Sequence, residues 1–124
     1  MFDLLKIKLF GQQPVAKISD QLLDTLIERD FKSNADLVKT KLKNINSESQ
    51  KGKNRIAAGV LKLADKNFDN LDGLIKKANE DSRDIMMWAE YPRCAKIGFD
   101  ELDKKQMKQI YLDDFIEFSN WLKV

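Results

Sequence analysis

The chain has 124 residues, of which 43% are hydrophobic and 34% are charged, and its net charge is +2. This balance excludes a disordered chain and predicts one globular domain over residues 1–124. The sequence contains no histidine and one cysteine, so it excludes an intrachain disulfide and the usual imidazole-based catalytic triads, and it lacks the commonest transition-metal ligand.

The first apolar run, residues 2–10, contains Lys6 and Lys8. A signal peptide carries its positive charge before an uncharged apolar stretch, so this run is not typical of one. No apolar run approaches the roughly 20 residues of a membrane-spanning helix. We therefore expect a cytoplasmic protein with no membrane span, in a reducing compartment that keeps the cysteine free.

Residues 2–10 leave two alternatives open. Leu5, Ile7 and Leu9 alternate with lysines, as in a strand that could pair between two copies of the chain. However, no second strand is predicted, so a short helix that stops at Gly11 is favoured. The oligomeric state is accordingly left open between monomer and homodimer.

From Ser19 onward, apolar residues recur at helical spacing, and polar residues that suit helix caps precede each apolar stripe. A capping box is expected over residues 33–36, and residues 47–54 are either a loop or the first turns of the following helix. Pro92 ends one helix because a residue before proline is pushed out of helical geometry, which makes residues 93–99 a connector. The expected helices cover residues 19–31, with a start as early as residue 14 left open, and residues 33–46, about 55–66, 71–78, 82–91 and 100–122.

This pattern predicts an all-α fold in a single compact domain of about six helices, bundle-like, with a long C-terminal helix. Rare bulky residues concentrate in one part of it, residues 85–94. The stretch from Ile85 to Ala89, which includes Trp88, is apolar all round and is expected to be a helix buried on every side.

The predicted protein-binding site is the connector over residues 91–96, together with neighbouring exposed parts of the helix over residues 82–91. Tyrosine and arginine are frequent in binding hot spots, and connectors carry function more often than scaffolds do. Positive neighbours favour a reactive thiolate at the cysteine, but a buried structural thiol is the favoured interpretation. The candidate residues are Tyr91, Arg93, Cys94 and Lys96.

Residues 34–66 carry eight positive and three negative charges. Lys51, Arg55 and Lys62 fall on one helical face, where phosphates could pair with them. Residues 32–67 contain no aromatic side chain on which a base could stack, so a solvated lysine face is favoured over binding of nucleic acid. The candidate residues for an anionic partner are Lys51, Lys53, Arg55 and Lys62.

Acidic residues suggest a third hypothesis, a carboxylate-based, metal-dependent enzyme. Asp113, Asp114 and Glu117 are close on one helix, but such clusters are usually solvated or cap other helices. A calcium-loop pattern that starts at Asp65 fails at its twelfth position, which is Lys76 instead of the required glutamate. We therefore assign no metal, no cofactor and no catalytic residue.

The favoured function is that of a small cytoplasmic, non-catalytic protein that binds another protein. An adaptor, regulatory or immunity-type role fits its size. Binding of a nucleic acid or anionic ligand by the basic residues 39–62 is the first alternative, and a metal-dependent enzyme is the second.

Overall fold

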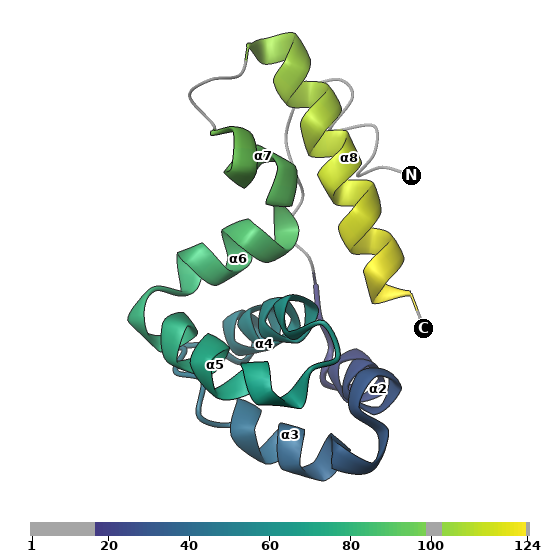
Figure 1. Ribbon diagram of the computed structural model, residues 1–124, viewed down its shortest axis with the longest axis vertical. Helices are drawn as coiled ribbons and strands as arrows, with labels where there is room; N and C mark the ends of the chain where they lie inside the picture. The colour runs from purple at the N-terminus through teal and green to yellow at the C-terminus, as the bar shows by residue number, and fades with distance from the viewer. Residues whose placement is uncertain (1–16, 99–102, 124) are drawn as a thin grey trace. The chain divides into compact units, whose positions relative to one another are not determined.

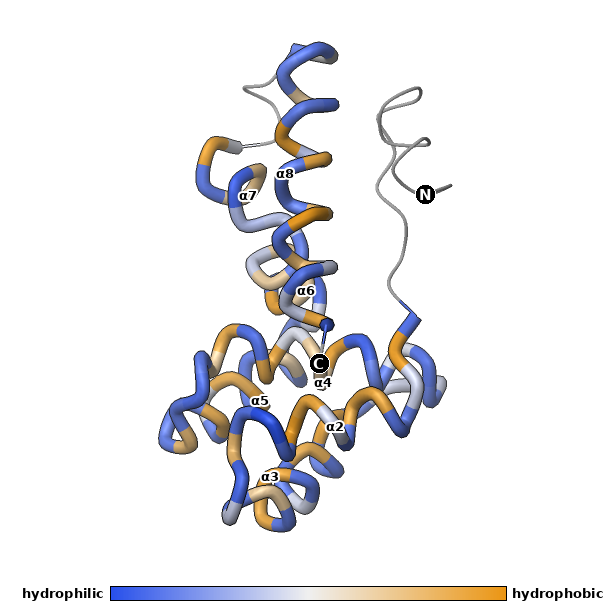
Figure 2. Tube along the Cα trace, turned by 90° about the vertical axis from the view of Figure 1, so that its right-hand side faces the viewer, coloured by the Kyte–Doolittle hydropathy of each residue, from blue (hydrophilic) through white to orange (hydrophobic). Residues whose placement is uncertain are grey.

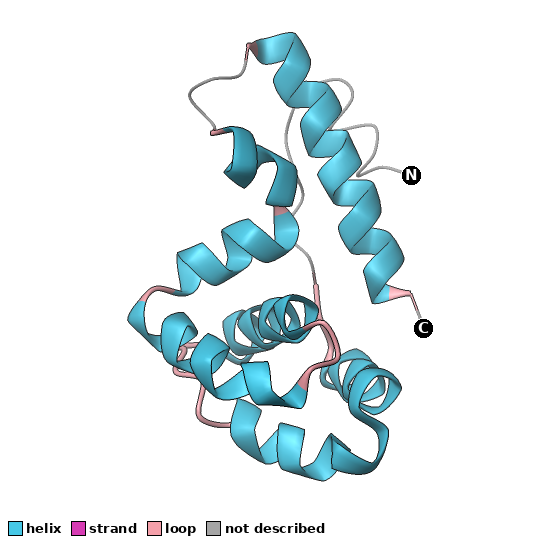
Figure 3. Cartoon of the chain, in the orientation of Figure 1, coloured by secondary structure: helices cyan, strands magenta, loops and turns pink. Residues whose placement is uncertain are grey.

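The computed structural model describes residues 17–98 and 103–123. These residues fall into two compact units, residues 17–89 and residues 90–123. Every regular element in the described ranges is a helix, and no strand occurs there (Figure 3). The all-α class and the long C-terminal helix are therefore confirmed. The single domain over residues 1–124 stays a prediction, and the helix-or-strand alternatives for residues 2–10 lie outside the described residues.

The unit of residues 17–89 is built around one central helix, α4. It packs against α2 and α5, and α3 packs against the same two neighbours (Figure 1). Two short 3-10 helices, at Lys32–Asn34 and Phe68–Asn70, join consecutive helices. The α-helices of this unit are α2 (Asp20–Phe31), α3 (Ala35–Leu42), α4 (Gln50–Ala64), α5 (Leu71–Glu80) and α6 (Ser82–Glu90), whose last residue belongs to the second unit.

The core of this unit is aliphatic. Leu26, Val38, Leu61 and Leu71 are fully buried, and each comes from a different helix of the set α2 to α5. Figure 2 shows the apolar segments of these helices as orange bands that alternate with hydrophilic blue. The apolar stripe of each helix thus also determines which side of the helix faces the core, because the stripe is buried against a neighbouring helix.

Helix α6 is buried on one face only. A Cβ atom at Gly59 of α4 would lie 3.1 Å from Cγ2 of Ile85 and 3.4 Å from Cβ of Ala89, so the missing side chain lets the two helices approach closely. Ile85 and Ala89 are buried, whereas Trp88 is 47% exposed. The prediction that this helix is buried on every side is wrong, because its contact with α4 covers a single stripe.

Several helix starts agree with the caps expected from the sequence. Oγ of Ser19 accepts a hydrogen bond from the Leu22 amide at 3.0 Å, and Oδ1 of Asp81 accepts one from the Arg83 amide at 3.0 Å. Helix α4 begins after Ser49, which caps it. Residues 50–54 therefore form the first turns of α4, one of the two alternatives that the sequence left open.

The expected capping box at residues 33–36 is wrong. The Lys32 amide donates to the Glu28 carbonyl and closes α2, and the chain reverses through a 3-10 turn in which Ser33 lies. Helix α3 also ends at Leu42 instead of residue 46. Asn79 of α5 explains this end, because its side chain accepts from the Asn46 amide at 2.9 Å and donates to the Asn44 carbonyl at 3.0 Å.

The second unit contains α7 (Pro92–Ile97) and α8 (Lys104–Leu122), which pack against each other. The prediction that residues 93–99 form a connector is wrong over residues 93–97. Proline ends the preceding helix but also suits the first position of a new one, where its missing N–H costs nothing. Asp103 caps α8 through a capping box with Gln106, and the earlier start expected at residue 100 lies outside the described residues.

Candidate functional site

Three residues of the predicted binding site, Arg93, Cys94 and Lys96, lie on α7, and Tyr91 directly precedes this helix. Helix α8 positions them. Asp114 of α8 is fully buried and points at the first turn of α7. One of its oxygens, Oδ1, accepts hydrogen bonds from the Arg93 amide at 3.1 Å and from Nη1 of the Arg93 guanidinium at 3.0 Å. The other, Oδ2, accepts from the Cys94 amide at 3.3 Å.

This carboxylate replaces a local cap. Tyr91 stands at the N-cap position of α7 and makes no side-chain capping bond, so the free amides at the helix start need another acceptor. A negative charge there also interacts favourably with the positive end of the helix dipole. The Arg93 guanidinium completes the arrangement, since it lies 3.5 Å from Oε1 of Glu117 as well. The hydrogen bonds to Asp114 are the main reason that the pKa of Arg93 is raised above its usual value.

Cys94 is a structural thiol. Its side chain is fully buried, and burial, together with the nearby Asp114 carboxylate, raises its pKa to about 12. The favoured interpretation of the sequence, a buried thiol, is confirmed, and the exposed reactive thiol is wrong. The local positive charges could not reveal this, because the dominant neighbour comes from a different helix.

Tyr91 is half-buried and packs edge to face on Tyr111 of α8, with ring centroids 5.9 Å apart and planes inclined by 70°. The same burial raises the pKa of Tyr111. Tyr91 and Cys94 thus hold α7 on α8, and they contribute little or no accessible surface to a partner.

The accessible side chains of α7 are Arg93, Lys96 and Ile97. Their spacing of three and four residues places them along one face of the helix. The side chain of Arg93 is 43% exposed and Ile97 is 47% exposed, while Lys96 is also exposed. The sequence did not single out Ile97, because an apolar residue in an expected connector carries no signal until the connector is seen to be a helix.

The basic residues of α4 are only partly available to an anionic partner. Lys62 donates to the Ala89 carbonyl at 2.9 Å, at the end of α6, and Lys53 donates to the Lys43 carbonyl at 3.2 Å. Arg55 is half-buried and has interactions within the protein, and Lys51 is exposed. The cations that share one face of α4 are therefore partly occupied by interactions within the protein.

Other lysines of the basic stretch pair with acidic residues from distant parts of the sequence. Nζ of Lys41 lies 2.7 Å from Oδ1 of Asp72 and 5.2 Å from the ring centre of Phe68, and Nζ of Lys39 lies 3.7 Å from Oε1 of Glu28. Carboxylates from other helices thus offset part of the excess positive charge of residues 34–66. Such exposed pairs contribute little stability, but they reduce the potential available to a phosphate backbone.

The carboxylates do not converge on a metal. In the described ranges, no group of three or more cysteine, aspartate or glutamate side chains is placed to hold a metal ion. Asp113 accepts a hydrogen bond from Gln109 at 3.0 Å, and its neighbour Asp114 is turned toward α7. Among the helices described, none is long and apolar enough to cross a membrane.

No protein family model matches this sequence, and no curated protein and no solved structure matches it either.

Proposed function

We propose that this chain is a small cytoplasmic, non-catalytic protein that binds another protein through the exposed face of α7. The observation that supports this proposal is the pairing of a rigidly held helix with an exposed apolar residue. Ile97 is 47% exposed, on a helix whose start is fixed by the buried Asp114. A partner that covers such a preformed face loses little conformational freedom on binding.

The charges beside Ile97 indicate the chemistry of the partner. Lys96 has no ion pair within residues 17–98 and 103–123, and Arg93 keeps part of its guanidinium accessible although Asp114 and Glu117 hold it. A complementary surface would place a carboxylate opposite Lys96 and an apolar side chain over Ile97. The face of one short helix is small, so the interaction is of the weak, transient kind that regulatory and adaptor proteins use.

The test replaces side chains that face solvent and leaves the contacts between α7 and α8 intact. We expect the double variant Lys96→Glu, Ile97→Ser to lose a partner that copurifies with the native chain from its host. Arg93→Ala is a poor test, because it also removes the contact with Asp114.

The matched control is Lys76→Glu, which makes the same charge change at an exposed position of α5. It should retain the partner, and all variants should keep the thermal midpoint of the native protein. If the α7 double variant and the native chain bind the partner with equal affinity in a purified system, α7 is not the binding surface.

The anionic-partner alternative has less support. Lys53 and Lys62 each donate a hydrogen bond inside the protein, and Lys51 alone is plainly open to solvent among the four residues considered. Steep weakening of nucleic-acid binding with added salt would revive this alternative, because such a dependence reports the release of counterions from phosphates.

A further inference from the structure

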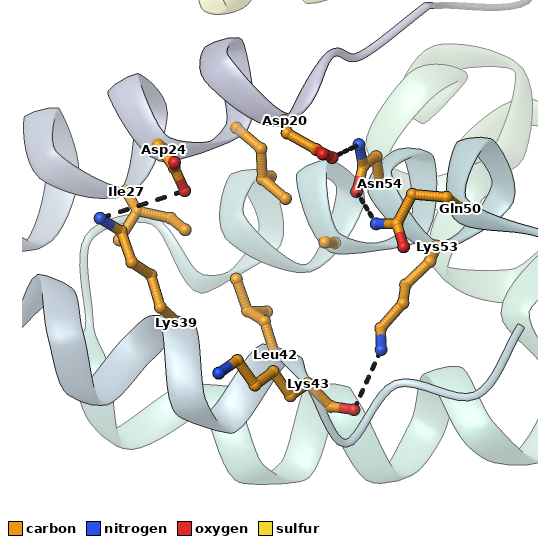
Figure 4. Close-up of a pocket in the computed structure, with 11 residues that line it drawn as sticks. Asp20, Asp24, Ile27, Lys39, Leu42, Lys43, Gln50, Lys53 and Asn54 are labelled. Atoms are coloured by element: carbon orange, nitrogen blue, oxygen red, sulfur yellow. Dashed lines mark hydrogen bonds and ion pairs between the residues drawn. The ribbon is translucent and has the colours of Figure 1, made fainter.

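A pocket of about 390 Å³ lies between α2, α3 and α4, wholly within the unit of residues 17–89 (Figure 4). Its apolar lining comes from all three helices and consists of Leu23, Ile27, Leu42 and Ala57. This volume falls in the range of pockets that hold small organic molecules. It shares no residue with the α7 face, so the inference drawn from it does not depend on the proposed protein-binding function.

One edge of the pocket is positively charged. Lys43 at the end of α3 and Lys53 of α4 both line it. Nζ of Lys53 donates to the Lys43 carbonyl at 3.2 Å, which holds this ammonium at the edge and leaves two of its three donors for other acceptors. The Lys43 ammonium has no hydrogen bond or ion pair to any residue that the structure describes.

The other charged groups that line the pocket already have partners within the protein. Lys39 lies between two carboxylates, 4.0 Å from Oδ1 of Asp24 and 3.7 Å from Oε1 of Glu28. Asp20 accepts a hydrogen bond at 2.7 Å from Asn54. Figure 4 shows the Lys39–Asp24 pair on the far side of the pocket from Lys53 and the Asp20–Asn54 pair beside Gln50. Three lysines and two aspartates line the pocket. Lys43 and Lys53 are the two of these lysines that have no carboxylate partner among the described residues.

The polar wall of the pocket is rigid. Asn54 is 4% exposed, and its amide donates to the Ile18 carbonyl at 3.0 Å and to Asp20, while it accepts from Gln50 at 2.9 Å. A buried polar group with its hydrogen bonds satisfied keeps a fixed position. The pocket is thus preformed and open to solvent, with a polar wall, an apolar lining and lysines at one edge.

We propose that this pocket binds a small organic acid, with its carboxylate at the edge that carries Lys43 and Lys53 and its apolar body against Leu23, Ile27 and Leu42. An apolar body alone would leave the lysines unused, and a cationic ligand would meet two ammonium groups at the edge. A ligand with a single carboxylate on a short branched or aromatic group would pair with the lysines and also contact the apolar side chains of the pocket.

The probe is 3-phenylpropanoate, titrated into the full chain and followed by the amide chemical shifts of α2, α3 and α4. We expect saturable shifts clustered around the pocket, with a dissociation constant in the millimolar range or below. The matched amine, 3-phenylpropylamine, should bind at least about tenfold more weakly, because like charges at the edge oppose it.

Lys43→Met and Lys53→Met remove one charge each and preserve most of the side-chain length. Each should weaken binding about three- to fivefold, the effect of losing one solvent-exposed ion pair. Lys76→Met, the same substitution at an exposed site on α5, should leave the affinity unchanged.

Three results would overturn the proposal. The first is the absence of saturation at about 10 mM acid, well above the constant expected for a specific weak ligand. The second is equal binding of the acid and the amine. The third is an equal loss of affinity in Lys76→Met and in the pocket variants, which would reduce the effect to the net charge of the protein.

Discussion

Replacing Asp114 with alanine tests the contact that positions the candidate site. The substitution removes a buried carboxylate and leaves the amides of Arg93 and Cys94 and the Arg93 guanidinium without that acceptor. Removing one partner of a buried ion pair costs about 3–5 kcal/mol, and loss of a helix cap costs about 1 kcal/mol by itself. Arg93 is 43% exposed and retains Glu117 at 3.5 Å, so water and Glu117 recover part of the loss. We therefore expect Asp114→Ala to lower the free energy of unfolding by about 3 kcal/mol.

The assay is urea denaturation followed by circular dichroism, with amide hydrogen exchange as a second readout. The free energy of unfolding of the unit that contains α7 and α8 should fall, and the Arg93 and Cys94 amides should exchange much faster. Asp113→Ala is the matched control, since this neighbour bonds only Gln109 among the contacts described, and it should change stability by about 0.5 kcal/mol or less. Asp114→Asn should fall between the two, because it keeps one acceptor oxygen but loses the charge. Equal stability of the Asp113 and Asp114 alanine variants would refute the assigned role of Asp114.

Three further predictions concern packing and pH. Gly59→Ala should destabilise the chain relative to Gly73→Ala, although both substitutions gain about 1 kcal/mol of helix propensity. The new Cβ at residue 59 would lie 3.1 Å from Ile85, whereas no atom lies within 4 Å of a new Cβ at residue 73. Equal thermal midpoints of the two variants would contradict the close approach of α4 and α6. The Cys94 thiol, with its pKa raised to about 12, should resist a thiol reagent in the native protein and react on unfolding. The unfolded thiol ionises near pH 9, whereas the folded thiol stays protonated there. The contribution of the Cys94 thiol to stability is therefore present below pH 9 and falls as pH rises toward 12. Alkaline denaturation curves of Cys94→Ala should lack this loss of stability. Trp88→Ala should lower the free energy of unfolding by clearly less than the roughly 3–5 kcal/mol lost with a fully buried aromatic side chain, because Trp88 is 47% exposed. A loss within that range, measured by urea denaturation, would place Trp88 in the core.

Most of the helical framework could be predicted from the sequence because the signals are local. Ser19 and Asp81 lie within three residues of the amides they cap, and the apolar stripe of α2 repeats within a single helix. The failures at α3 have the opposite cause. Helix α3 ends early because Asn79, more than thirty residues away in the chain, binds the backbone beyond it, and no pattern within residues 33–46 contains that information.

The candidate site was predicted in part. Arg93 and Lys96 are exposed, in agreement with a surface role, but Cys94 is buried and Tyr91 packs on Tyr111. The sequence signal at Asp114 was ambiguous, since a carboxylate within an acidic cluster usually faces solvent. Its partner is twenty-one residues away, so only the packing of α7 on α8 identifies it as a cap.

The sequence by itself determined the class of the protein: an all-α chain in which several helices begin at polar caps and amphipathic helices bury one apolar stripe each. These properties follow from backbone geometry and side-chain spacing within one or two turns. The tertiary structure decided which face of each helix is covered, which lysines are paired and which carboxylate is buried. Those outcomes depend on contacts between residues far apart in the chain, as with Gly59 against Ile85 and Asp114 against Arg93, and local patterns do not encode them.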